Sequence, residues 1–146
     1  MIVSTKGRYA LKAMLDMAEN ANEGFVPMKD IAARQCVSKK YLEQIMPALV
    51  KNGLVEGVQG KGGGYRLTRK PSEYTVGEIL RIAEGGFSPV SCRACTGQNC
   101  SNAGNCKTVD MWAHFIEITN QFFDSISLEM VLNHEIGTRE NIYFSL

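Results

Sequence analysis

The residues best suited to chemistry are four cysteines within 15 residues of one another, in the pattern C-x2-C-x4-C-x5-C. The segment around them is rich in glycine and asparagine and offers almost nothing apolar to bury. Free cysteines usually pack as small hydrophobic residues, so this polar segment is the wrong setting for cysteines that only pack. Thiolates clustered on a loop can hold a soft metal ion or an iron–sulfur cluster. The four are Cys92, Cys95, Cys100 and Cys106.

The rest of the composition favours ligation over disulfide bonds. The N-terminus shows no charged, then apolar, then small-residue leader, so we expect no signal peptide. The longest apolar runs are far shorter than the roughly 18–20 residues that span a bilayer, so we expect a cytoplasmic protein with no membrane partner. In that reducing compartment, clustered cysteines more often bind metal or undergo redox chemistry. The fifth cysteine, Cys36, stands apart, and five thiols fit a paired disulfide framework poorly.

The net charge of +1 hides an uneven distribution along the chain. Residues 1–70 hold twelve Lys/Arg against six Asp/Glu, a net charge of +6, and residues 71–146 hold four against nine, a net charge of −5. The basic half suggests a surface that faces a polyanion, and the acidic half a different task. With 146 residues and 45% hydrophobic content, the chain can form one compact domain with an appendage.

Two helices are predicted at the start of the basic half. Over residues 5–22, apolar residues recur at spacings of three and four, which marks one buried helix face, and Ser4 or Thr5 is the expected N-cap. A shorter helix is predicted over residues 28–35. A connection of about three residues leads to the next helix, and two helices joined in this way have the geometry of a helix-turn-helix.

The third helix is predicted to begin near Lys39, with Ser38 as its N-cap, and to end before Gly53. Apolar residues three and four apart supply its buried face. Pro47 removes one hydrogen bond from this helix, so we expect a bend near residues 43–47 without loss of the helix.

Two short strands are predicted next, over residues 54–58 and 65–68, and the glycine-rich segment 59–64 between them is the expected tip of a β-hairpin. A phosphate-binding loop needs a Gly-Lys-Ser/Thr ending that opens a helix, which this segment lacks. A helix-turn-helix followed by a two-stranded wing is instead a layout that binds DNA.

The exposed side of the third helix carries residues suited to reading DNA, because its first turn contacts the bases in this motif. Gln44 suits adenine, and Lys39, Lys40 and Lys61 can neutralise phosphates. Glu43 is the exception, since a carboxylate repels phosphate, yet it can accept from a cytosine amino group or discourage a wrong base. A solvated helix face is the plainer interpretation of the same charges.

The acidic half is predicted to contain three helices and the cysteine segment. A capping-box pattern at Thr75 opens a helix over residues 76–84. The cysteine segment, residues 86–106, is long enough to favour a function over simple connection. A long helix is then predicted over 107–124, and a last short helix over 128–134.

The long helix carries two apolar stripes, which is more than one small domain needs to cover. This pattern favours burial against a second copy of the chain, and burial within the monomer is the alternative. The expected fold is mainly α with a small β-hairpin. It divides into a winged helix-turn-helix domain (1–85), a cysteine-rich cluster-binding loop (86–106), and a dimerisation helix with a C-terminal tail (107–146). The stripes are Met111, Phe115, Ile118 and Phe122, and Trp112, Ile116 and Phe123.

Four motifs, in order along the chain, resemble the bacterial regulators of the IscR, NsrR and CymR group. They are S-T-K-G-R-Y-A at 4–10, Y-L-E-Q-I at 41–45, K-N-G-L-V at 51–55 and G-K-G-G-G-Y at 60–65. The aromatic tail at 142–144 resembles the end of CymR, and the chain as a whole is most similar to the IscR branch. It implies a cytosolic homodimer that binds palindromic promoter DNA, such as that of iron–sulfur cluster assembly genes. In the IscR and NsrR branches it also implies an iron–sulfur cluster, here expected to be 2Fe–2S.

The resemblance also assigns DNA-contacting residues. It places the DNA-reading positions on the turn and the third helix, at Ser38, Lys40, Tyr41, Glu43 and Gln44. At a wing position that is often arginine in IscR this chain has Gln59, which changes the expected minor-groove contact. The full candidate set is Arg8, Ser38, Lys39, Lys40, Tyr41, Glu43, Gln44, Gln59, Gly60 and Lys61.

The resemblance matches three cluster ligands, Cys92, Cys100 and Cys106. The match rests on the five residues between Cys100 and Cys106, which is the spacing of the last two cysteines in IscR. Where IscR uses a histidine three residues after its last cysteine, this chain has Val109. The position of an acidic ligand in NsrR matches Arg8, which is not a ligand. The fourth ligand therefore stays open among Cys95, Glu43 and His114.

We thus expect a DNA-binding regulator, not an enzyme, that senses an iron–sulfur cluster which an apo preparation would lack. The sequence shows no nucleophile paired with a base that would indicate catalysis. One alternative is a winged-helix regulator with zinc or a thiol/disulfide switch at the C-x2-C pair. Another is a regulator of cysteine metabolism of the CymR type. A ferredoxin-like electron carrier would explain the cysteines but not the wing.

Overall fold

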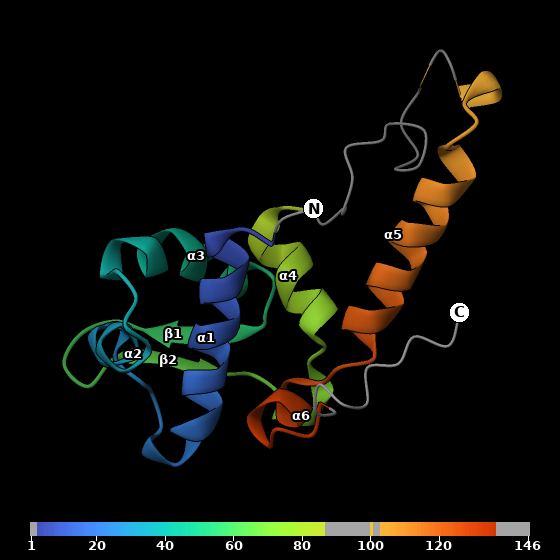
Figure 1. Cartoon of the computed structure of the whole chain (residues 1–146). Helices are drawn as coiled ribbons and strands as arrows, with labels where there is room; N and C mark the ends of the chain where they lie inside the picture. Colours follow the sequence, from blue (N-terminus) through green and yellow to red (C-terminus); the bar gives the residue numbers. More distant parts are fainter. Residues whose placement is uncertain (1–2, 87–99, 101–102, 137–146) are drawn as a thin grey trace.

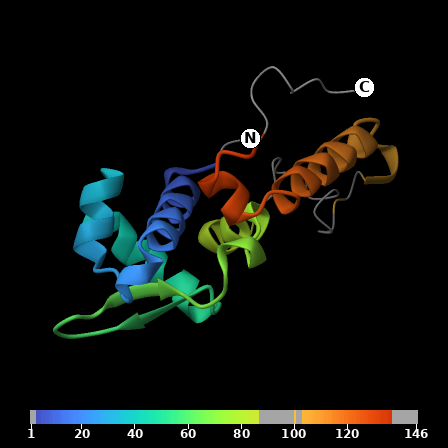
Figure 2. The same ribbon diagram turned by 90° about the horizontal axis from the view of Figure 1, so that it is seen from below.

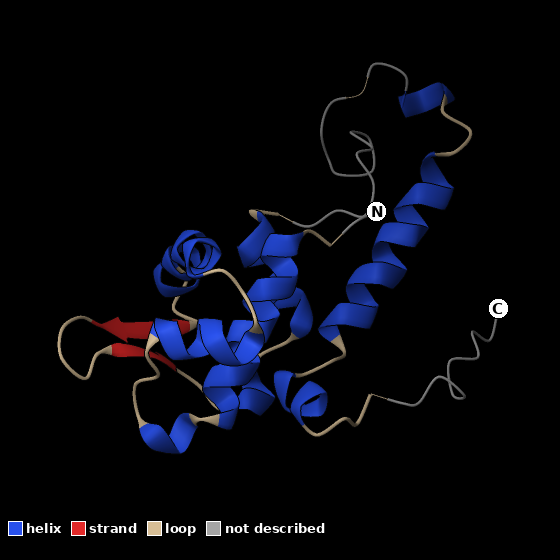
Figure 3. Ribbon diagram, turned by 60° about the vertical axis from the view of Figure 1, so that its left-hand side comes forward, coloured by secondary structure: helices blue, strands red, loops and turns tan. Residues whose placement is uncertain are grey.

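In a computed structural model the chain is mainly helical with one antiparallel β-hairpin, as the sequence predicts (Figures 1 and 3). The structure describes residues 3–86, 100 and 103–136. None of the helices within these ranges is long and apolar enough to cross a membrane. The elements are α1 (Thr5–Glu19), η1 (Ala21–Glu23), α2 (Met28–Gln35), α3 (Lys39–Lys51), β1 (Val55–Val58), β2 (Gly64–Leu67), η2 (Pro71–Glu73), α4 (Val76–Glu84), η3 (Ala103–Asn105), α5 (Val109–Asp124) and α6 (Leu128–Leu132), where η marks a 3-10 turn.

Helix α1 begins where the sequence predicts but ends earlier than the expected span of 5–22. Ser4 is the N-cap, and its hydroxyl accepts hydrogen bonds from two N–H groups of the first turn. The helix ends at Glu19 because Asn20 folds back on it, with Asn20 Nδ2 donating to the Asp16 carbonyl at 2.8 Å. Such local bonds from asparagine end a helix independently of the apolar spacing on which the prediction rests.

Helices α2 and α3 form the predicted helix-turn-helix. Cys36 ends α2 in the left-handed conformation (φ 52°, ψ 44°), and Val37 is buried beneath the turn. Ser38 is the N-cap residue of α3, as the sequence predicts, although its side chain makes no capping hydrogen bond. Ser38 is exposed, and water can satisfy the N–H groups at this end of the helix.

Helix α3 is retained through Pro47, as the sequence predicts. Proline lacks the N–H that would bond to the carbonyl four residues earlier, which belongs to Glu43. Pro47 and Glu43 both lie on the exposed side of the helix, where water can replace the missing donor. The buried side is intact and consists of Leu42, Ile45, Met46 and Leu49.

The main core lies between α1, α2, α3, α4 and the base of the hairpin. Two methionines of α1 are part of this core: Met14 is fully buried and Met17 almost so. A smaller cluster of Val76, Leu80 and Ile126 lies at the junction of α4 with the end of α5, and Phe123 packs against it. The second cluster is what attaches α5 to the domain.

Strands β1 and β2 form the predicted wing, with Val55 opposite Leu67 and Val58 opposite Gly64. The hairpin is joined to the segment before α2, because Val26 and Tyr65 exchange two backbone hydrogen bonds of 2.8 Å. The wing is therefore tied to the start of the helix-turn-helix as well as to its end.

A buried tyrosine fixes the base of the wing. The Tyr74 hydroxyl accepts hydrogen bonds from the N–H groups of Thr68 (2.9 Å) and Arg69 (2.8 Å), and it donates to the Leu54 carbonyl at 2.8 Å. One side chain thus joins the strand that enters the hairpin to the strand that leaves it. Buried tyrosines usually find such partners, because an unbonded buried hydroxyl is costly.

The helices of the acidic half form close to their predicted positions. Thr75 caps α4 by accepting a hydrogen bond from the Glu78 N–H at 3.1 Å. Helix α5 begins at Val109, two residues later than the predicted 107–124, and α6 ends at Leu132 rather than at 134. In Figures 1 and 2, the C-terminal end of α5 lies beside α4, and its N-terminal end is directed away from the domain.

Asp16 on α1 is a fully buried carboxylate that joins α1 to α2. It accepts hydrogen bonds from Arg34 Nε (3.0 Å), Arg34 Nη2 (2.7 Å) and Gln35 Nε2 (3.1 Å). The bidentate pairing fixes the C-terminal end of α2, which leads into the turn between α2 and α3.

We expect Asp16→Asn to lower the free energy of unfolding by about 2–3 kcal/mol, because hydrogen bonds to charged groups are stronger than neutral ones and a side-chain amide would face donors. Glu56→Gln is the matched control, since it removes a charge from the half-exposed pair with Arg66 and should cost about 1 kcal/mol or less. Chemical denaturation measures both. Equal losses would show that Asp16 contributes no more than a surface pair.

Candidate nucleic-acid interface and cysteine segment

The first half of α3 presents the predicted reading residues on one exposed side. Leu42 and Ile45 are turned into the core, and every candidate on this helix is exposed. The arrangement follows from the helical period of about 3.6 residues, because residues on the side of the helix opposite the buried positions face outward. The exposed candidates are Ser38, Lys39, Lys40, Tyr41, Glu43 and Gln44.

The carboxylate of Glu43, which would repel phosphate, has a cation beside it. Lys39 Nζ lies 3.6 Å from Glu43 Oε1, one helical turn away, and both side chains are more than half exposed. The pair offsets the local negative charge without burying either group. Lys40 has no ion-pair partner among the described residues, so its charge faces solvent.

Tyr41 is positioned from α1 by an aromatic neighbour. The rings of Tyr9 and Tyr41 meet edge to face, with centroids 5.6 Å apart and an interplanar angle of 87°. Such a pair adds to the stabilisation from burial and limits the directions that the exposed ring can take. The sequence predicts Tyr9 only as part of the apolar face of α1, and helical spacing cannot show this second role.

The wing tip presents Gln59, Gly60 and Lys61 to solvent. Gly60 adopts φ 97°, a conformation that side chains disfavour. At Gly63 a Cβ atom would overlap the Val58 carbonyl oxygen, so only glycine allows the two strands to turn this tightly. The glycines of this segment thus shape a narrow hairpin tip, as expected for a wing.

A groove of about 530 Å³ brings the wing tip and the recognition helix α3 together. Lys39 and Glu43 line it from α3, and Gln59 and Gly60 line it from the wing. Lys29, at the start of α2, lines the same groove and is exposed, although it is not among the candidates predicted from the sequence. The signal available was its position just after Pro27, at the first turn of the helix-turn-helix.

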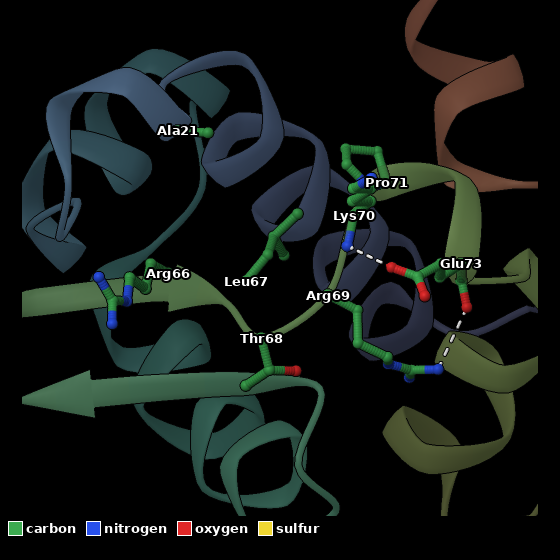
Figure 4. Close-up of a pocket in the computed structure, with 8 residues that line it drawn as sticks. All are labelled: Ala21, Arg66, Leu67, Thr68, Arg69, Lys70, Pro71 and Glu73. Atoms are coloured by element: carbon green, nitrogen blue, oxygen red, sulfur yellow. Dashed lines mark hydrogen bonds between the residues drawn. The ribbon is translucent and has the colours of Figure 1, made fainter.

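A second hollow, of about 440 Å³, lies at the other end of the hairpin (Figure 4). Its arginines are already neutralised: Arg66 pairs with Glu56, and Arg69 Nη2 lies 2.8 Å from Glu78 Oε1. The hydrogen bond with Glu78 is the main cause that raises the pKa of Arg69 above its ordinary value. These pairings favour a structural role for this hollow, and it contains none of the candidate DNA-contacting residues.

Two of the four clustered cysteines, Cys92 and Cys95, lie outside the described residues. Cys100 is exposed, and Cys106 is half-buried just before α5. Cys106 Sγ lies 3.4 Å from Thr108 Oγ1, and this hydrogen bond is the main cause that lowers the pKa of the Cys106 thiol, followed by the Thr108 backbone N–H. A lowered pKa favours the thiolate, which is the form that binds metal.

The other ligand candidates lie apart from Cys106. In Figures 1 and 2, α3, which carries Glu43, and the N-terminal end of α5 are at opposite sides of the molecule. His114 is exposed on α5, with its Nδ1 3.8 Å from the Glu117 carboxylate. Arg8 is exposed on α1 and donates to Thr5 Oγ1 at 3.4 Å. Among residues 3–86, 100 and 103–136, no three His, Cys, Asp or Glu side chains gather as a metal site.

A model of the Rrf2 family, described as iron-dependent transcriptional regulators, matches residues 3–134. The chain belongs to this family. It is 40% identical over 146 residues to the HTH-type transcriptional regulator IscR of Aliivibrio salmonicida, a match that covers 97% of this chain and 86% of that relative. It is 41% identical over 137 residues to the IscR of Klebsiella pneumoniae, covering 93% and 83%.

Solved structures of this Rrf2-family fold agree with the architecture. The structure of CymR, the global cysteine regulator of B. subtilis, superposes with a TM-score of 0.74 at 33% identity, covering 92% of this chain and 98% of that one. The IscR of T. potens gives a TM-score of 0.71 at 33% identity, covering 99% and 94%. The predicted fold class and the expectation of a transcriptional regulator rather than an enzyme are therefore confirmed.

In this Rrf2-family regulator, we expect Lys40→Ala and Lys61→Ala to weaken binding to all DNA duplexes alike. For each phosphate that is no longer neutralised, the slope of log K against log salt concentration should fall by about 0.9, because fewer counterions are released. Binding titrations at several salt concentrations measure this slope. Lys70→Ala is the control, since Lys70 is equally exposed but lies at the opposite end of the hairpin. An unchanged slope for both variants would remove these lysines from the interface.

Proposed function

We propose that two copies of this chain bind palindromic promoter DNA, and that binding responds to an iron–sulfur cluster held by the cysteine segment. The observation that carries the proposal is the exposed face shared by α3 and the wing tip, in a chain that belongs to a family of transcriptional regulators. Because its proposed partner is promoter DNA, we assign the protein to the cytoplasm. The IscR relatives support iron–sulfur cluster assembly genes as targets.

In this proposal the first turns of α3 enter a major groove and the wing tip follows the adjacent backbone. Gln44 reads adenine through its side-chain amide, and Glu43 accepts from a cytosine amino group. Lys40 and Lys61 neutralise phosphates on either side of the groove. Ser38 is suited to a backbone contact, because its hydroxyl takes no part in capping α3. Arg8, exposed near the start of α1, supplies one further cation.

Helix α5 supports the dimer. At 100° per residue its side chains divide into a face covered by the domain, a polar face and an exposed apolar face. Four large apolar side chains on the last of these are between 37% and 55% exposed, far more than such residues usually are in a finished core. A second α5, related by two-fold symmetry, would cover them. They are Met111, Phe115, Ile118 and Phe122.

The donor set at the cysteine segment fits an iron–sulfur cluster. Thiolates are the usual ligands of such clusters, and the lowered pKa of Cys106 favours ligation at the start of α5. When bound, a cluster would supply a redox-active group that oxidants or iron limitation can remove. We assign the ligands Cys92, Cys100 and Cys106, with Cys95, Glu43 or His114 as the fourth. Because Glu43 lies apart from Cys106 within one chain, it could only serve from the other copy.

A second candidate is a regulator of cysteine metabolism, with zinc or a thiol/disulfide switch at the cysteine segment. The structural likeness to CymR, a cysteine regulator, favours it. Elemental analysis separates these candidates. Iron with inorganic sulfide supports the cluster, stoichiometric zinc supports the zinc site, and the absence of both metals supports the thiol/disulfide switch.

We expect Phe115→Glu to dissociate the dimer and abolish binding to palindromic DNA, because a charge would be stranded in an apolar interface. Sedimentation and binding titrations measure the two effects. Ala113→Glu is the control: residue 113 is exposed and lies on the opposite side of the helix, so the same charge should leave the dimer intact. A Phe115→Glu protein that stays dimeric would move the interface elsewhere.

We expect Cys92→Ala, Cys100→Ala and Cys106→Ala each to lose the visible absorbance of anaerobically reconstituted protein, and Cys95→Ala to lose less. Iron and sulfide analysis, with DNA titration of the loaded and unloaded forms, completes the test. Cys36→Ser, which alters the exposed cysteine of the helix-turn-helix, is the control and should keep the absorbance.

Equal bleaching by Cys95→Ala and Cys100→Ala would make the site all-cysteine and the three-cysteine assignment wrong. Bleaching by Glu43→Ala or His114→Ala would identify that residue as the fourth ligand. Wild-type protein that contains neither iron nor sulfide after anaerobic reconstitution would exclude the cluster altogether.

A further inference from the structure

Helix α5 behaves as an arm attached to the domain at one end. Most of its covered side chains lie from the middle of the helix onward, where Thr119 is buried and Ile116 and Phe123 are partly covered. Its first half carries exposed side chains on nearly every side. If the two copies join through the exposed face, the direction in which α5 leaves the domain decides how far apart the two recognition helices stand.

The position of the attached end is fixed by backbone hydrogen bonds just after the helix. The Val76 N–H donates to the Ile126 carbonyl at 2.9 Å, and the Leu128 N–H donates to the Tyr74 carbonyl at 3.0 Å. These bonds hold the chain against the start of α4, but they do not fix the direction of the helix that precedes them. They fix the position of this end of α5, about which the direction of the helix is set by other contacts.

A small cradle on α4 holds the last residue of α5. Asp124 Oδ1 lies 2.5 Å from Arg81 Nη2, and it occupies the space that a side chain at residue 77 would need. A Cβ atom added to Gly77 would overlap that oxygen and would lie 3.1 Å from Arg81 Nη1. Because Gly77 and Arg81 are one turn apart on the same side of α4, the carboxylate sits over a glycine and under a guanidinium.

The packing of α5 on the domain leaves one polar atom unsatisfied within the part of the chain that the structure describes. Asn120, one turn before Asp124, has a buried Oδ1 without a hydrogen-bond partner among the described residues. An unbonded buried acceptor is costly, so this stripe of the helix is not optimised for a single direction. The Asp124–Arg81 ion pair over Gly77 is a directional contact at this end of α5, since a close ion pair seated against a glycine tolerates little rotation.

We propose that Gly77, Arg81 and Asp124 set the direction of α5 and thereby the half-site spacing that the dimer accepts in its operator. The inference rests on the proposed dimer and its binding to a palindrome. A helix of 16 residues is about 24 Å long, so a tilt of about 10° moves its free end by about 4 Å. That displacement is comparable with the rise of about 3.4 Å per base pair. The salt bridge is half-exposed and adds little stability, so its contribution is geometric.

The test compares operators that differ only in spacing. A duplex is first selected by the wild-type dimer from a random-sequence pool, and two further duplexes are made with one base pair removed from or added to its centre. Dissociation constants for all three are measured at one salt concentration, for wild type, Asp124→Asn, Arg81→Gln and Gly77→Ala. Sedimentation confirms that each variant is folded and dimeric.

We expect wild type to prefer its selected spacing by about tenfold or more, because a rigid dimer cannot contact both half-sites fully at another spacing. The cradle variants should reduce that preference to about threefold or shift it to another spacing, while remaining dimers. Glu78→Gln is the matched control, because Glu78 lies on the same helix as Arg81 and its ion pair with Arg69 is similarly exposed. This variant should keep the wild-type preference.

Three results would overturn the inference. If dimeric Asp124→Asn and Arg81→Gln keep the wild-type preference, the cradle does not set the spacing, and the proposed function stands. If affinity falls equally for all three duplexes, the cradle only stabilises the fold. If wild type is monomeric or selects no palindrome, the proposed function fails and the inference fails with it. Should Gly77→Ala fail to fold, the comparison of Asp124→Asn and Arg81→Gln with wild type decides the outcome.

Discussion

Burial of α1 is the constraint on which both halves of the molecule depend. Its small residues Ala10 and Ala13 are fully buried, so neighbouring helices can approach its backbone closely. Its first turn is tied to α4 by one carboxylate: Glu84 Oε1 accepts from the Ser4 hydroxyl (2.8 Å) and from the N–H groups of Ser4 (3.1 Å) and Gly7 (3.2 Å). A Cβ atom at Gly7 would overlap that oxygen. The helix that supports α3 and the helix that supports α5 therefore form one unit, and this contact fixes α4 relative to α1.

The fold was largely predictable because its elements carry strong periodic signals. The apolar spacing in α3 and the capping residue of α4 each depend on local sequence, and both elements form as expected. Errors fall where a local hydrogen bond overrides the spacing. Asn20 ends α1 early through its hydrogen bond to the Asp16 carbonyl. Contacts between distant segments, such as that of Glu84 with α1, leave no local pattern and could not be predicted.

The candidate site divides in the same way. Exposure of the residues on α3 and at the wing tip follows from periodicity and glycine content, which the sequence shows directly. Their shared groove depends on how the hairpin packs, and the packing is fixed by Tyr74 and by the pairing of Val26 with Tyr65. For that reason Lys29, which reaches the same groove from α2, could not be selected from spacing alone. The fourth ligand of the proposed cluster is likewise a question of which elements of two copies meet, and one chain's spacing does not contain that information.

The cysteine segment and the recognition helix need no direct contact for one to influence the other. The segment joins the end of α4 to the start of α5, and Cys106 immediately precedes that helix. A ligand held by Cys106 and its neighbours would therefore restrain the end of α5 that the domain leaves exposed, while Asp124 and Arg81 restrain the other end. Because a ligand shifts an equilibrium only by its differential affinity for two states, the proposed cluster would act on DNA binding only by favouring one direction of α5 in the proposed dimer.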